Sequence, residues 1–324
     1  MPAIITHDLF GRDVYGELFG LIGGTKDEAE AFLLGNQGPD PLFYTVVSPT
    51  LTGHHRLGST MHAKHPARLL DALKRSLALL DEGQRSVGRA YALGFLCHYT
   101  LDSTMHPFVY YHQYALCDAG EPGLSREDGS EVHAAIESDL DELVLYTKLG
   151  QTVATFDTSR QILRGRDEVL RAVSRMYAFM AREVYDEDVP DNIYVLAVKD
   201  FRFVQGFFHS PHGVKRELLG TLECAVRPHS FLRAMSHRAI EATSSIFDNA
   251  EHLPWENPYT GEVRTASFWD LYEEALAKAR DNIAVFDAPG FDERAARELT
   301  GELNFSGEPT GAQLLSVEDV PARG

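Results

Sequence analysis

The strongest structural signal in this chain is the stretch His98-Tyr99-Thr100-Leu101-Asp102, which is followed one turn later by His106. Its spacing recurs further on in His133-Ala134-Ala135-Ile136-Glu137. On an α-helix, a histidine and a carboxylate four residues apart lie on one face, so their side chains converge. Either pair alone is explained by a structural ion pair. Two such pairs on neighbouring predicted helices, with His106 within reach of the first, favour a metal site.

The chain is strongly acidic. Its 324 residues include 30 Lys and Arg against 48 Asp and Glu, which leaves a net charge of −18. Such a surface repels phosphate backbones, so we expect no extended nucleic-acid binding. Part of the acidic excess is expected to serve as metal ligands.

The cysteines and the N-terminus indicate a cytoplasmic protein. Cys97, Cys117 and Cys224 are odd in number and widely spaced, as expected for reduced thiols. Acidic residues interrupt the N-terminal stretch, and no basic start is followed by an apolar region. No window approaches about 18 uninterrupted apolar residues, so no membrane span is expected.

Apolar periodicity at helical spacing recurs along the chain and period-2 alternation is scarce, so the expected class is all-α. The capping box Thr25-Lys26-Asp27-Glu28 opens a helix that stops at Gly35, and Pro66 opens a second helix that runs to Gly83. Residues 84–106 are apolar over much of the helix circumference, which is typical of a central helix. Because Pro107 follows, we expect that helix to end at His106. Further helices are predicted over residues 130–149, 161–184, 192–208, 214–226, 231–247 and 267–285.

We expect one helical domain over residues 1–290, with a metal-site core in 1–150 and a helical extension in 151–290. Residues 37–55, 118–129 and 252–261 are rich in turn formers and are predicted loops. The helical signal falls after residue 288, so residues 291–324 are predicted to be a C-terminal tail that is mobile at its end.

Several residues near these motifs are expected to be structural. Cys97 points to another face of its helix than His98, which predicts a buried thiol. Histidines without a ligand-like partner spacing are His209, His212, His229, His237 and His252.

The motif His133–Glu137 and four segments, one of which contains His98 and Asp102, together resemble the bacterial zinc-dependent phospholipase C family. The segments are MPAIITH at residues 1–7, GNQGPDP at 35–41, LGSTMH at 57–62 and GFLCHYTLD at 94–102. That family is similar in fold to secreted phosphatidylcholine-cleaving phospholipases and to fungal single-strand-specific nucleases. The resemblance, which covers about the first 150 residues, implies a multi-helix bundle of that type.

The resemblance also implies two to three zinc ions per chain. The implied ligands are Asp40, His62, His98 and Asp102 for one zinc, His106, His133 and Glu137 for a second, and His7, Asp102 and the N-terminus for a third. Asp102 would then bridge two metals. Nitrogen and oxygen ligand sets with an open position suit catalytic zinc.

Two details of this ligand set carry alternatives. Initiator methionine is commonly trimmed before proline, so we expect the amine and carbonyl of Pro2 to be ligands; Met1 retained on fully active protein in an intact-mass measurement would contradict this. The alternatives to His62 as a zinc ligand are His54 and His55, which lie closer to Asp40 in sequence. We favour His62 because Leu57-Gly58 precedes it and a predicted helix follows it.

The expected function is zinc-dependent hydrolysis of a phosphoric ester, with a small phosphodiester or a phospholipid head group as substrate. A zinc-activated water would attack phosphorus, with Asp40 as the catalytic residue that orients or deprotonates it. The alternatives are a single-strand nuclease or nucleotidase-like phosphodiesterase and a non-catalytic protein stapled by metals. An HD-type phosphohydrolase fits poorly, because the one His-Asp dipeptide, His7-Asp8, has no histidine ahead of it. Oligomeric state is left open.

Aromatic residues beside the motifs either line a substrate pocket or belong to the core. They are Phe43, Tyr44, Tyr99, Phe108, Tyr110 and Tyr111.

Overall fold

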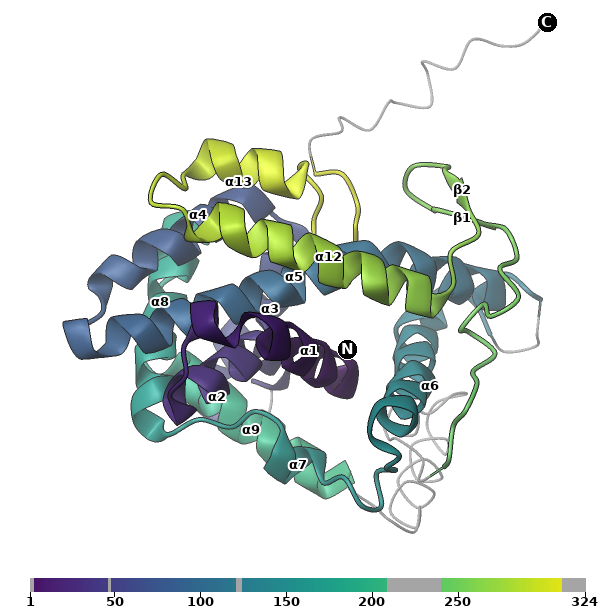
Figure 1. Ribbon diagram of the computed structural model, residues 1–324, viewed down its shortest axis with the longest axis horizontal. Helices are drawn as coiled ribbons and strands as arrows, with labels where there is room; N and C mark the ends of the chain where they lie inside the picture. The colour runs from purple at the N-terminus through teal and green to yellow at the C-terminus, as the bar shows by residue number, and fades with distance from the viewer. Residues whose placement is uncertain (1–2, 46–47, 121–123, 209–239, 311–324) are drawn as a thin grey trace, which may run out of the picture.

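The computed structural model describes residues 3–45, 48–120, 124–208 and 240–310 (Figure 1). These residues are overwhelmingly helical, which confirms the predicted all-α class. The one sheet among them is a two-stranded antiparallel hairpin of β1 (Trp255–Glu256) and β2 (Val263–Arg264), within and just after the predicted loop 252–261. No helix of the described residues is long and apolar enough to cross a membrane.

The α-helices are α1 (Ile4–Ile22), α2 (Lys26–Gly35), α3 (Leu57–Ala63), α4 (Pro66–Ser76), α5 (Glu82–Cys117), α6 (Gly129–Leu149), α7 (Thr158–Gln161), α8 (Asp167–Tyr185), α9 (Ile193–Phe208), α12 (Phe268–Asp287) and α13 (Glu293–Thr300). Short 3₁₀ helices are η1 (Asp40–Tyr44), η2 (Pro49–His54), η3 (Leu77–Leu79) and η4 (Arg126–Asp128).

Helix α5 is the centre of the fold, as its all-round apolar sequence predicts. It packs against α1, α2, α6, α8 and α12, which surround it in Figure 1. It approaches α2 closely where Gly94 faces Gly35. A Cβ on Gly94 would lie 2.0 Å from the carbonyl oxygen of Phe32, so only glycine fits there.

The predicted end of this helix at His106 is wrong, because α5 continues through Pro107 to Cys117. A proline inside a helix costs about 3 kcal/mol, since it removes one hydrogen bond and crowds the preceding turn. Phe108 and Val109, both buried, continue the apolar face of α5 beyond the proline. Their packing outweighs the local penalty.

Other predicted helix boundaries are confirmed. The capping box at Thr25 and Glu28 is present at the start of α2. Helix α6 ends at Gly150, whose φ of 61° is the left-handed cap conformation. Helix α12 begins after Ser267, whose side chain accepts from the backbone of Asp270.

Other segments differ from their predictions. The helix predicted from Pro66 to Gly83 ends at Ser76, and the helix predicted over 161–184 begins at Asp167. Helix α1 was not predicted. Residues 240–247, the described part of the helix predicted over 231–247, form no helix, and the helix predicted over 214–226 lies outside the described residues. Residues 293–300, predicted to belong to the C-terminal tail, form α13, whose face packs on α4.

The thiol of Cys97 is buried, as predicted, and burial raises its pKa. Cys117 is also buried, and both thiols are reduced. Cys224 lies outside the described residues.

An ion pair ties α5 to the end of α12. Arg89 donates to both carboxylate oxygens of Asp287, at 2.7 and 2.6 Å, and to the carbonyl oxygen of Leu21 at 2.8 Å. The hydrogen bonds from Arg89 hold the pKa of Asp287 below its ordinary value of 3.8. Both side chains keep roughly a third of their surface in solvent, so screening limits the contribution of the pair.

We expect Arg89→Met to lower the free energy of unfolding by about 1 kcal/mol at pH 7. Because folding depresses the pKa of Asp287, the stabilisation is present above about pH 4 and is lost as pH falls further. Urea unfolding of both proteins at pH 7 and pH 3 measures the difference. An equal loss at both pH values would contradict an ionic contribution, and Asp287→Asn is the matched partner variant.

Candidate metal centre

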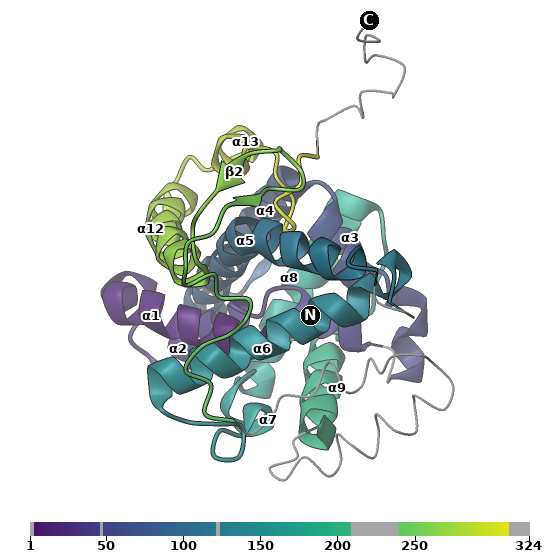
Figure 2. The ribbon, with the colours of Figure 1, turned by 90° about the vertical axis from the view of Figure 1, so that its right-hand side faces the viewer.

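Eight side chains capable of binding a metal converge where α1, α3, α5, α6 and η1 meet. They are His7 on α1, Asp40 on η1, His62 on α3, His98, Asp102 and His106 on α5, and His133 and Glu137 on α6. Figure 2 shows α6 crossing below α5, the arrangement that brings the two helical motifs together. Three groups have ligand atoms mutually within 4.8 Å: His7, Asp40 and His98; His62, His98 and Asp102; and His106, His133 and Glu137.

The first part of the centre surrounds the imidazole of His98, which is fully buried. Its Nε2 atom lies 3.2 Å from Oδ2 of Asp102 and 3.7 Å from Oδ1 of Asp40. Nε2 of His62 lies 3.0 Å from the same Asp40 oxygen. Yet Nε2 of His98, Nε2 of His62 and Oδ1 of Asp40 form no hydrogen bond. Buried polar atoms that approach without hydrogen-bonding geometry fit a shared cation between their lone pairs.

The second part joins α5 to α6. Oε1 of Glu137 lies 3.3 Å from Nε2 of His106 and 3.3 Å from Nε2 of His133. Two imidazoles and a carboxylate are a ligand set that suits zinc with an open fourth position.

Asp102 lies between the two parts and also faces α1. Its Oδ1 is 3.1 Å from Nε2 of His7, whereas its Oδ2 is directed to His98. Oδ1 is also 3.8 Å from Nδ1 of His106. A carboxylate whose two oxygens face different histidines is placed to bridge two cations.

Four of the five histidines of the centre, all except His7, are oriented by a contact at Nδ1. In each, Nδ1 lies within hydrogen-bond distance of an oxygen outside the cluster: the carbonyl of Asn36 for His98 (3.1 Å), of Gly58 for His62 (2.8 Å), of Phe305 for His106 (2.8 Å), and the amide Oε1 of Gln113 for His133 (2.9 Å). Donation from Nδ1 leaves the Nε2 lone pair directed at the carboxylates. Metal-ligating histidines are oriented in this way, by a hydrogen bond at the nitrogen that does not bind.

The electrostatics of the centre agree with a cation site. Burial lowers the pKa of His98 to about 4, so this imidazole is neutral at pH 7 and has a nitrogen lone pair available for a metal. Although burial opposes ionisation of Asp102, the histidines around it hold its pKa well below the ordinary range. Against the effect of burial, Asp102 and Glu137 raise the pKa of His106 to about 9. A divalent cation between these carboxylates would displace the proton that they hold on His106.

The segment 35–40 supplies Asp40 through a tightly held turn. Gly38 has φ of +48°, and a Cβ there would lie 2.2 Å from the ring of His98. Its carbonyl oxygen accepts from the hydroxyl of Tyr177 at 2.7 Å. The hydroxyls of Tyr91 and Tyr194 also reach this oxygen, at 3.4 and 3.5 Å. All three tyrosines are fully buried, so they fix the turn two residues before Asp40.

Helix α1 is held against α6 by a buried carboxylate. Asp141 accepts hydrogen bonds from the backbone of Ile5 (3.1 Å) and Thr6 (2.7 Å) and from the Thr6 hydroxyl (2.6 Å). It caps the donors at the start of α1, which have no partners within the helix. The cap positions His7 in the following turn.

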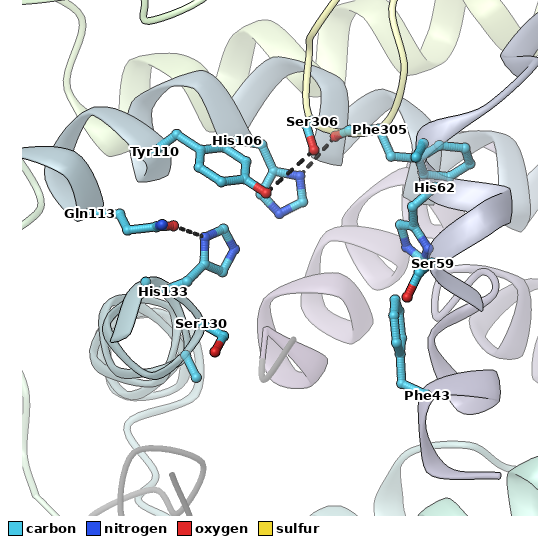
Figure 3. Close-up of a pocket in the computed structure, with 13 residues that line it drawn as sticks. Phe43, Ser59, His62, His106, Tyr110, Gln113, Ser130, His133, Phe305 and Ser306 are labelled. Atoms are coloured by element: carbon cyan, nitrogen blue, oxygen red, sulfur yellow. Dashed lines mark hydrogen bonds between the residues drawn. The ribbon is translucent and has the colours of Figure 1, made fainter. Parts of the chain in front are cut away.

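A cavity of about 480 Å³ opens onto the centre (Figure 3). Its lining includes the histidines His62, His106 and His133, the aromatic residues Phe43, Tyr110 and Phe305, and the uncharged polar residues Ser59, Gln113, Ser130 and Ser306. In Figure 3, His133 and Gln113 lie on one side and His62, Ser59 and Phe43 on the other. The volume falls in the range of small-molecule sites.

The structure brings together every predicted ligand that it describes; Pro2 lies outside the described residues. His62, rather than His54, faces Asp40. Nδ1 of His54 instead lies 2.7 Å from Glu187. His55 is exposed. His252 is exposed and lies against the carbonyl of Thr265, whereas the other four histidines predicted to be structural are in the undescribed part.

Of the aromatic residues near the motifs, Phe43 and Tyr110 line the cavity, while Tyr44, Tyr99 and Phe108 are buried in the core and Tyr111 packs against it. Sequence reasoning missed Phe305, Ser306 and the tyrosines that hold Gly38. Phe305, Ser306, Tyr177 and Tyr194 lie far from the motifs in sequence, and Tyr91, seven residues before His98, follows no ligand spacing, so the sequence alone offers no signal for them.

The family described as zinc-dependent phospholipase C matches residues 6–187 of the chain. The match contains all eight convergent side chains and ends before α9. Neither curated proteins nor solved structures give a significant match.

Proposed function

This chain belongs to the zinc-dependent phospholipase C family, and on that premise we propose that it hydrolyses a phosphodiester at the cavity beside the metal centre. Asp40, His62, His98 and Asp102 would hold one zinc, and His106, His133 and Glu137 a second. His7 and Asp102 would hold a third together with Pro2.

The observation that carries the proposal is the orientation of the histidines. Nδ1 of His62, His98, His106 and His133 each meets an outside oxygen, so the four Nε2 atoms face carboxylates across short distances. Nε2 of His62 and of His98, and the Asp40 oxygen between them, form no hydrogen bond, whereas an ordinary ion pair would direct an N–H group at the carboxylate. This pattern favours a metal centre over a purely structural cluster.

Zinc bound here would supply Lewis-acid charge that activates water and offsets the negative charge of the phosphoryl oxygens. The chain itself has to position the substrate and accept a proton. Asp40 is the proposed general base: its Oδ1 has no hydrogen-bond partner and lies at the centre. A water held by Asp40 would attack phosphorus, and the ester oxygen on the opposite side would leave.

The cavity supports a small substrate. Three of the proposed ligands, His62, His106 and His133, form part of its wall, so a phosphoryl group in the cavity would reach the metals. Phe43 and Tyr110 offer aromatic contact to the remainder of the substrate. We propose a phospholipid-type diester as the first substrate class.

Zinc content and turnover test the proposal together. Untagged protein is expected to contain two to three zinc per chain by elemental mass spectrometry, and to hydrolyse bis-p-nitrophenyl phosphate and p-nitrophenylphosphorylcholine. Removing zinc with a chelator should abolish turnover, and zinc should restore it.

The same assays separate the alternatives. Turnover of single-stranded DNA with no activity on p-nitrophenylphosphorylcholine would replace the lipid-type substrate with nucleic acid. A third outcome is zinc-loaded protein that cleaves none of these esters but unfolds at lower temperature without zinc. It would refute the proposed activity and support a non-catalytic protein whose helices are held together by metal ions. His252→Ala should retain zinc and turnover, because this side chain is exposed and belongs to none of the three clusters.

A further inference from the structure

The loop that follows α13 reaches back to the metal centre from beyond the residues matched by the family. Leu303 and Pro309 pair across its base, and the loop between them is closed by Asn304. The side-chain oxygen of Asn304 accepts from the backbone of Ser306 at 2.9 Å and of Glu308 at 3.0 Å. We refer to these residues as the Leu303–Pro309 loop.

Contacts from the loop tip hold two proposed zinc ligands at once. The backbone N–H of Phe305 donates to the carbonyl oxygen of His62 at 3.1 Å. The carbonyl of the same residue accepts from Nδ1 of His106 at 2.8 Å, as drawn in Figure 3. One residue of the loop therefore links α3 to α5, and each of the two histidines belongs to a different part of the centre.

The side chain of Phe305 is buried between the same elements. It is 1% exposed, and its ring centroid lies 4.8 Å from that of His62 and 5.7 Å from that of His98. The hydroxyl of Tyr99 on α5 donates to the carbonyl of Leu303 at 2.8 Å, which anchors the base of the loop. The loop is thus packed into the centre rather than laid over it.

Gly307 sets how closely the loop approaches α5. Its φ is +72°, and a Cβ there would lie 2.6 Å from Cγ of Pro107 and 2.8 Å from the carbonyl oxygen of Ser103. Pro107 directly follows His106. Any side chain at position 307 would therefore push the loop away from the residue whose imidazole it orients.

We propose that the Leu303–Pro309 loop is a positioning element of the metal centre, in which the Phe305 peptide orients His106 and secures the helix that carries His62. The proposal rests on the proposed function, because it assumes that both histidines bind zinc. The acceptors of the other three oriented histidines, Asn36, Gly58 and Gln113, lie within residues 6–187, so among the four Nδ1 contacts only that of His106 comes from the C-terminal part of the chain.

Gly307→Ala in the full-length protein tests this role. Its matched control is Gly261→Ala in the β1–β2 hairpin, where φ is +73° and the nearest atom to a Cβ is 3.8 Å away. Both substitutions incur the same backbone strain, but only the first displaces the loop. Zinc dissociation constants, measured by competition with a chromophoric chelator, are expected to rise about 10- to 100-fold for one site in Gly307→Ala and to stay unchanged in Gly261→Ala.

Two further readouts distinguish positioning from a general loss of structure. The visible spectrum of Co²⁺-substituted Gly307→Ala should change, while the circular dichroism of the metal-free variant remains helical. Tyr99→Phe, which removes only the hydroxyl that anchors Leu303, should weaken the same zinc site to a smaller extent, and it covers the case in which Gly307→Ala fails to fold.

The outcomes separate the two proposals. Zinc affinities in Gly307→Ala and Tyr99→Phe equal to those of the wild-type protein would overturn the role of the loop and leave the proposed function intact. Wild-type protein that binds no zinc would overturn both.

Discussion

Asp102→Asn is expected to lower kcat/KM for bis-p-nitrophenyl phosphate by at least about 10³-fold, or ~4 kcal/mol of transition-state stabilisation. Asp102 faces His7 with one oxygen at 3.1 Å and His98 with the other at 3.2 Å. An amide keeps the shape of the side chain but carries no charge, and its nitrogen cannot bind a cation. Replacing it should therefore weaken two of the proposed zinc sites at once.

Steady-state kinetics and zinc content on the same preparations measure this effect. The zinc content should fall by at least one ion per chain. Asp118→Asn is the charge-matched control, because Asp118 caps the far end of α5 in an exposed pair with Arg126. Full zinc content and activity within tenfold of the wild-type protein in Asp102→Asn would reject a bridging carboxylate.

The part of the centre that is local in sequence was predictable. The spacing of four residues in His98–Asp102 and His133–Glu137 requires only an α-helix to bring each pair together. The structure has these pairs at 3.2 and 3.3 Å. Their roles as zinc ligands remain predictions until metal is measured.

The groups that orient the histidines were not predictable. Three of the four acceptors are backbone carbonyls, those of Asn36, Gly58 and Phe305, and every residue type has a carbonyl. Which carbonyl meets an imidazole depends on how separate helices pack. The contribution of Phe305 depends on a segment that the sequence pattern assigned to a tail.

Helix α1 was missed for a related reason. Its first turns bury Thr6, His7 and Asp8 as well as apolar side chains, so no stripe of apolar residues marks one face. These polar side chains are buried with partners from other parts of the fold or the next turn: Thr6 with Asp141, His7 with Asp102, and Asp8 with Arg12. Their burial obscures the periodicity from which a helix is predicted.

The cap that holds α1 is expected to have the largest effect on stability. Asp141→Ala should lower the free energy of unfolding of the metal-free protein by about 3 kcal/mol. Asp141 is fully buried and accepts three hydrogen bonds, from the backbone of Ile5 and from the backbone and hydroxyl of Thr6. Without it, buried donors at the start of α1 lose their acceptor.

The loss should be smaller than the sum of three hydrogen bonds, because the substitution also removes a buried charge whose desolvation opposes folding. Urea unfolding of the metal-free variant measures it. Asp139→Ala, two residues earlier on α6, removes a half-buried carboxylate that accepts from the hydroxyl of Ser245, and should cost about 1 kcal/mol or less. Equal losses in the two variants would show that the cap contributes nothing beyond an ordinary polar contact. Because His7 follows the capped turn, weaker zinc binding in Asp141→Ala would also connect the cap to the third proposed zinc site.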